Sequence, residues 1–126
     1  MGFKPILIAF VVGVTAPLLP ASAYAGPADV AGVKVNKTAP NTYRFDVTVK
    51  HGDEGWDHYA DRWDVVSPDG TVLGTRILHH PHVEEQPFTR SKSGIKIPKE
   101  VKTVIIRAED SVHGLGEETV ELKVPH

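Results

Sequence analysis

The sequence predicts an all-β protein, an immunoglobulin-like antiparallel β-sandwich of about seven or eight strands. Three observations lead to this fold class. Apolar and polar residues alternate in short runs, turn-forming residues separate those runs, and no segment carries the spacing of an amphipathic helix. Short alternating strands with turns about every 8–12 residues are typical of such sandwiches.

The strands are expected, in chain order, around residues 33–35, 43–49, 63–65, 71–78, 95–97, 101–108 and 120–124. Residues 43–49 give the clearest pattern, because four apolar side chains alternate with polar ones. A Ser-Pro-Asp-Gly turn at 67–70 predicts a hairpin between the third and fourth strands. Residues 51–60 and 109–118 are expected to be polar loops, and residues 79–90 a loop or an irregular edge strand.

Residues 1–25 are expected to be a cleaved signal peptide, which leaves one domain over residues 26–126. Lys4 precedes a short apolar run, and Ala23 and Ala25 are the small residues that signal peptidase requires. The run is well short of the roughly 20 residues that cross a bilayer, so we expect no stable membrane span after cleavage. The predicted location is periplasmic or secreted. Retention of the segment as an anchor is the alternative, and without a cysteine a lipid anchor is not expected.

Composition excludes several classes of function. The sequence has no cysteine, which rules out a thiol nucleophile, a thiolate ligand and a redox disulfide. Residues 26–126 carry a formal net charge of −3, because Lys4 is the one charged residue before them. This charge argues against a nucleic-acid partner. No serine-hydrolase or zinc-protease motif is present, and no particular reaction is assigned.

All seven histidines lie in the predicted domain, and six of them fall into three loop or strand-end segments. Loops distant in sequence meet at one end of a sandwich, and neutral imidazole is a common ligand of transition metals. The predicted cofactor is therefore one metal ion, Fe, Cu or Zn. The predicted ligands are His51, His58, His82 and His113, with His80 as a further candidate.

Other roles are open for these polar residues. A single loop histidine is more often solvated or bound to a carbonyl, and His126 is expected to be a free tail. Asp53, Glu54 and Asp57 can orient an imidazole through its second ring nitrogen, or they can simply face water.

Two segments, HGDEGWDHY at 51–59 and DSVHGLG at 110–116, resemble superoxide reductases of the desulfoferrodoxin and neelaredoxin type. That family has an immunoglobulin-like sandwich whose iron is held by loop histidines, in a His-Pro-Met…His-x-Ile stretch and a Cys-Asn-x-His-Gly-x-Trp stretch. His58 corresponds to the second histidine of the first stretch, and His113 to the histidine of the last.

The sequence departs from that family at three places. Asp110 stands where the family has its axial cysteine, Gly116 replaces the tryptophan, and the gap between His51 and His58 is one residue longer. The resemblance therefore implies a mononuclear metal site, with Asp110 as an oxygen ligand, but without the thiolate that tunes iron for superoxide reduction.

Two rival functions come from the same residues. In the first, the protein is a non-enzymatic binding or structural module, and HHPHVEEQPFTR at 79–90 is an exposed segment that recognises a protein partner. In the second, the histidines form a pH-responsive surface, because protonation of all seven would change the net charge from −3 to about +4.

Overall fold

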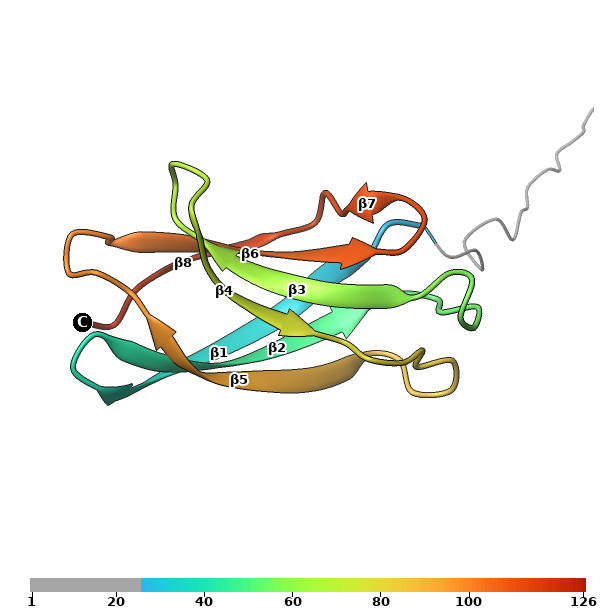
Figure 1. The fold of residues 1–126 in the computed structure, drawn as a ribbon, viewed down its shortest axis with the longest axis horizontal. Helices are drawn as coiled ribbons and strands as arrows, with labels where there is room; N and C mark the ends of the chain where they lie inside the picture. Colours follow the sequence, from blue (N-terminus) through green and yellow to red (C-terminus); the bar gives the residue numbers. More distant parts are fainter. Residues whose placement is uncertain (1–25) are drawn as a thin grey trace, which may run out of the picture.

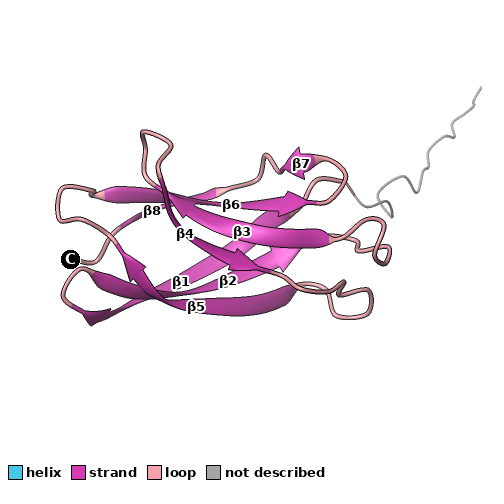
Figure 2. Cartoon of the chain, viewed as in Figure 1, coloured by secondary structure: helices cyan, strands magenta, loops and turns pink. Residues whose placement is uncertain are grey.

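The computed structural model describes residues 26–126, which fold into eight β-strands in two antiparallel sheets (Figures 1 and 2). The predicted signal peptide lies outside the described residues. The strands are β1 (Asp29–Ala39), β2 (Thr42–Lys50), β3 (Ala60–Val66), β4 (Val72–Ile77), β5 (Phe88–Lys96), β6 (Thr103–Asp110), β7 (Gly114–Leu115) and β8 (Val120–Lys123). The predicted all-β sandwich is therefore confirmed.

The sheet order is that of an immunoglobulin-like Greek key. One sheet has the order β1-β2-β5, and the other has β4-β3-β6, with β7 and β8 pairing successive stretches of β6. The chain crosses from the first sheet to the second between β2 and β3, and returns between β4 and β5. These two crossings place residues from both sheets at one end of the sandwich.

The core forms because alternate side chains of each strand point between the sheets. Trp63, Tyr43 and Phe45 are fully buried there, together with valines and isoleucines of β2, β3 and β6. In β6 the alternation is regular, since Val104, Ile106 and every second residue after them are buried. Asp110 is the last residue in this buried series, so its carboxylate lies at the end of the core rather than in solvent.

Residues 79–90 contain both of the expected forms, a loop over 79–87 and then the start of an edge strand. The last three of them belong to β5, and the short strand expected around residues 95–97 is the end of this same strand. Phe88 pairs with Val49 across the sheet and is only 2% exposed, because it fills the core between the two sheets. The proposed recognition segment is thus not exposed as a whole.

The C-terminal histidine is also not a free tail. His126 Nε2 donates to the Val101 carbonyl at 2.8 Å, and its Nδ1 accepts from the Tyr43 hydroxyl at 3.0 Å. A buried phenol needs such a partner, and this contact supplies it. No helix among the described residues is long and apolar enough to cross a membrane.

Candidate metal centre

Three loops meet at the end of the sandwich that lies on the right in Figure 1, opposite the C-terminus. They follow β2, β4 and β6, and they carry six of the seven histidines. Two hydrogen bonds join the first loop to the third, because Tyr59 and Ser111 each donate a main-chain N–H to the other residue. The loops are therefore held together by the backbone as well as by their side chains.

One oxygen atom, Oδ2 of Asp110, is the centre of the histidine cluster. It lies 3.0 Å from His51 Nε2, 3.2 Å from His58 Nε2 and 2.9 Å from His113 Nδ1. His58 Nε2 is also 3.2 Å from His113 Nδ1. His51, His58 and Asp110 are buried, and their ligand atoms lie within 4.8 Å of one another, so this group can hold a metal ion.

The other oxygen of Asp110 is fully used by the backbone. Oδ1 accepts hydrogen bonds from the main-chain N–H groups of Val112, at 2.9 Å, and of His113. This turn places the His113 ring beside the carboxylate that its own main chain holds. The side chain of His113 remains 39% exposed, so solvent reaches the cluster from this side.

Two further carboxylates determine which ring nitrogens face the cluster. His51 Nδ1 lies 2.5 Å from Asp53 Oδ1, and His58 Nδ1 lies 2.7 Å from Glu54 Oε1. An ionised carboxylate only accepts, so each Nδ1 carries the proton. In the neutral rings, both Nε2 atoms then point a lone pair at Asp110.

This arrangement places two lone pairs against an anionic oxygen, with no hydrogen between them. Either protons or a cation must occupy that space, because facing acceptors repel. The separations of 2.9–3.2 Å between ligand atoms are close to the roughly 3.3 Å edge of a tetrahedron with bonds of about 2.0–2.1 Å. A carboxylate on the second nitrogen of a ligating histidine is also the usual partner in metal sites.

The charges in the cluster shift two pKa values. Burial lowers the pKa of His58, but its hydrogen bonds to Glu54 and Asp110 outweigh burial and raise that pKa above the usual 6.5. Burial raises the pKa of Asp110, but the hydrogen bonds from His113, Val112 and His58 together hold it well below its usual range. Asp110 is therefore a carboxylate at neutral pH, as a ligand must be.

His82 and His80, both sequence candidates, lie outside this group. The main-chain N–H of His82 donates to Asp53 Oδ2 at 2.6 Å. Residue 82 therefore binds the carboxylate oxygen that His51 does not contact. Its ring stacks on Phe88, with centroids 3.9 Å apart, and burial lowers its pKa. The exposed His80 packs against the His82 ring, and its Nδ1 donates to the Pro81 carbonyl.

The sequence pattern did not identify how the neighbouring carboxylates divide their roles. Asp53 and Glu54 both contact histidines, whereas Asp57 is exposed. Gln86 was not recognised as part of the site at all. Its side chain accepts from the His51 main-chain N–H and donates to the His82 carbonyl, each at 2.9 Å. No short sequence motif predicts this pair of hydrogen bonds, because Gln86 and His51 lie in loops 35 residues apart.

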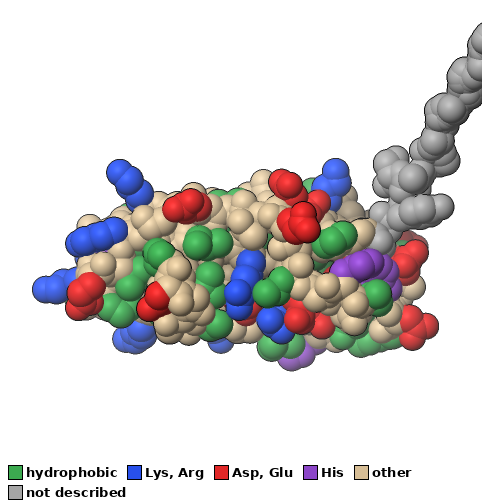
Figure 3. Space-filling model, turned by 90° about the horizontal axis from the view of Figure 1, so that it is seen from above, with side chains coloured by type: hydrophobic (Ala, Val, Ile, Leu, Met, Phe, Trp, Pro, Cys, Tyr) green, Lys and Arg blue, Asp and Glu red, His purple; other side chains and the backbone are tan. Residues whose placement is uncertain are grey.

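The surface around the cluster is acidic and partly apolar. The segments 51–59, 79–87 and 110–119 contain no Lys or Arg. In Figure 3 most lysine and arginine side chains lie toward the other end and the middle, while a patch of purple histidine lies near this end. Four large exposed apolar side chains also belong to these segments: Trp56, Val83, Val112 and Leu115. The acidic surface favours the approach of cations.

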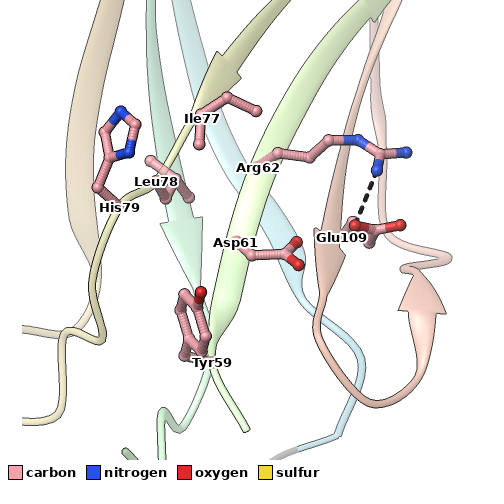
Figure 4. Close-up of a pocket in the computed structure, with 7 residues that line it drawn as sticks. All are labelled: Tyr59, Asp61, Arg62, Ile77, Leu78, His79 and Glu109. Atoms are coloured by element: carbon pink, nitrogen blue, oxygen red, sulfur yellow. Dashed lines mark hydrogen bonds and ion pairs between the residues drawn. The ribbon is translucent and has the colours of Figure 1, made fainter. Parts of the chain in front are cut away.

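A second polar feature lies next to the cluster, in a pocket lined by Tyr59, Asp61, Arg62, Ile77, Leu78, His79 and Glu109 (Figure 4). The strand pairing shifts between Ala60 and Arg62, so Asp61 is the extra residue of a bulge. Burial, and then the neighbouring Glu109, raise the pKa of Asp61 to about 6. Arg62 binds Glu109 at 2.8 Å and offsets only part of this effect.

Asp61→Asn is expected to raise the free energy of unfolding by about 1 kcal/mol at pH 8, a value reduced from the full pKa shift because Asp61 is partly solvated. With its pKa raised, Asp61 holds its proton more tightly in the folded state. Wild-type stability therefore falls as the pH rises from about 4 to 6. Urea unfolding at pH 4 and pH 8 measures the difference. An equal gain at both pH values would contradict this prediction.

Comparison with known proteins finds a relative named "Putative lipoprotein" from Halomicrobium mukohataei. It is 39% identical over 89 residues, which cover 71% of this chain and 43% of the relative. This chain thus spans less than half the length of the relative that it matches. No family model matches the chain, and no solved structure does.

Proposed function

We propose that this protein is an exported β-sandwich domain that binds one transition-metal ion through His51, His58, His113 and Asp110. The observation that carries the proposal is the convergence of three ring nitrogens on Asp110 Oδ2. Asp53 and Glu54 support it, because each accepts a hydrogen bond from the far ring nitrogen of a histidine and so leaves the near one free to coordinate.

The ligand set favours zinc, iron or copper over harder cations. Imidazole suits Zn, Cu and Fe, whereas Mg²⁺ and Ca²⁺ prefer sites built from oxygen alone. The resemblance to superoxide reductases agrees with the positions of His58 and His113. Because Asp110 stands in place of the family's cysteine, we propose metal binding and assign no superoxide reduction.

Export is supported by two independent features. The first 25 residues have the composition of a signal peptide. The relative from Halomicrobium mukohataei is named as a lipoprotein, a class of exported and membrane-attached proteins. A metal site made without cysteine also suits an oxidising compartment, where a free thiolate would be at risk of oxidation.

The proposal is tested by metal reconstitution. The untagged protein is stripped with a chelator, loaded separately with Zn²⁺, Cu²⁺ or Fe²⁺ at pH 7.5, desalted and analysed for metal. We expect about one ion per chain for at least one metal, as a single four-ligand site requires. Less than about 0.1 ion per chain for all three metals would reject the proposal.

Metal binding is also expected to weaken in acid. His58 must lose its proton to coordinate, and its raised pKa makes protons compete at a higher pH than for an ordinary histidine. Below that pKa, the apparent affinity should fall about tenfold per pH unit for each proton displaced. Titrations between pH 5 and pH 8 measure this slope, and a flat profile would contradict coordination by His58.

A further inference from the structure

We infer that His82 is a positioning residue for the proposed metal site. In the metal-bound protein, His82 Nδ1–H donates a hydrogen bond to Asp53 Oδ2 and holds the carboxylate that orients His51. The inference rests on the proposed function and extends it to the second loop, 79–87, which supplies no ligand to the cluster. His82 acts on the ligand His51 through the side chain of Asp53.

Asp53 is the link between the cluster and this loop. Its side chain is completely buried, and its Oδ1 accepts from His51 Nδ1 at 2.5 Å and from the Ala60 main chain at 3.1 Å. On the other side, Oδ2 accepts from the main-chain N–H of His82 at 2.6 Å. One carboxylate therefore joins a ligand ring, the start of β3 and the second loop.

The imidazole of His82 is the incomplete part of this link. Both of its ring nitrogens are buried, and neither has a hydrogen-bond partner. A neutral imidazole always carries one N–H, and leaving it buried without an acceptor is unfavourable. The nearest carboxylate oxygen is Asp53 Oδ2, which lies 4.0 Å from His82 Nδ1.

The packing around His82 allows this gap to close. The ring lies parallel to Phe88, at an interplanar angle of 8°, so it can slide within its own plane without losing the stack. A movement of about 1 Å would bring Nδ1 within hydrogen-bond distance of Oδ2. A cation at the cluster draws His51 and Asp53 more firmly into place, which favours this contact.

The backbone of the second loop is already bound to His51 by a second route. Gln86 accepts from the His51 main-chain N–H and donates to the His82 carbonyl. Residue 82 thus contacts the site through its N–H, through its carbonyl and, when the gap closes, through its ring. Since the backbone contacts do not depend on the side chain, substitutions at His82 test the ring alone.

Three substitutions separate a hydrogen-bond donor from simple packing. His82→Asn places an amide NH₂ at the position of Nδ1, His82→Gln places it one bond further out, and His82→Phe keeps only the aromatic ring. Metal affinity is measured by chelator competition on each full-length protein, with Zn²⁺ and Cu²⁺ as probes. Thermal unfolding of the metal-free proteins checks that each variant folds.

We expect His82→Phe and His82→Gln to bind metal about 10–100-fold more weakly, and His82→Asn to stay within about threefold of the wild type. The number of nitrogen ligands, counted by electron paramagnetic resonance of the Cu²⁺ forms, should be the same in all of them. If His82→Phe does not fold, the comparison of His82→Asn with His82→Gln still decides.

Equal affinities across the series, or a His82→Asn variant as weak as His82→Gln, would overturn the inference. The loss of one nitrogen ligand in His82→Asn would overturn it too, because His82 would then be a ligand itself. If the wild type binds none of these metals, the proposed function fails. If the wild type binds metal but the series does not respond, only the role of His82 fails.

Discussion

Asp110→Ala is expected to lower metal affinity by more than about 100-fold, the upper end of the effect of losing an outer contact. The reason is that Asp110 Oδ2 touches all three ring nitrogens of the cluster, and Oδ1 holds the turn that presents His113. The substitution removes a ligand and loosens a second one. Chelator competition on the reconstituted protein measures the loss.

Asp57→Ala is the matched control. Asp57 is an exposed carboxylate in the loop that carries His51 and His58, so its removal changes the local charge but no contact with the cluster. We expect less than a threefold effect, the size of a weak surface interaction. Wild-type affinity in Asp110→Ala would contradict the site, as would equal losses in both variants.

Asp110→Asn tests how the charge of Asp110 contributes to the stability of the metal-free protein. The low pKa of Asp110 means that its ionised form stabilises the folded state above the unfolded pKa of about 3.9, and this contribution is lost as the pH falls through the lower folded value. Asparagine keeps the shape of the side chain but has no charge to lose. The unfolding free energy of the variant should therefore depend less on pH in the acid range.

Gly116→Ala is expected to destabilise the protein by about 3 kcal/mol or more, at the upper end of the cost of overpacking. An added Cβ would lie 1.8 Å from the carbonyl oxygen of Ala28 and 2.9 Å from its carbonyl carbon. Both are backbone atoms of a buried residue, so no side chain can turn away to make room. Urea denaturation of the metal-free protein measures the change.

Gly32→Ala is the control for this prediction. Gly32 lies in β1, where an added Cβ would meet no atom within 4 Å. We expect a small gain, about 0.4–1 kcal/mol, because alanine has less freedom in the unfolded chain. Unchanged stability in Gly116→Ala would mean that Ala28, the residue before β1, does not pack on the segment after β7.

The sequence predicted the sandwich well because the fold depends on local alternation. Tyr43, Phe45, Val47 and Val49 are all fully buried, as their spacing of two requires. The strand ends were less well predicted. The prolines at 81 and 87 hide the start of β5 in the sequence, so the pattern assigns Phe88 to a recognition segment.

The site was predicted in part. Loop positions predict His51, His58 and His113, the family resemblance adds Asp110, and the structure brings these four residues together. His82 was named by the same reasoning, but lies on the far side of Asp53. Clustering in sequence shows which loop carries a histidine, but not which way its ring turns.

From the amino-acid order follow the fold class, the end of the sandwich where the histidines gather, and the absence of thiol chemistry. These properties depend on composition and on a period of two, which are present in the chain before it folds. The roles of Asp53 and Gln86 depend on contacts between loops up to 35 residues apart. Those contacts arise only when the two sheets pack, because the packing selects which nitrogen of each ring meets a carboxylate.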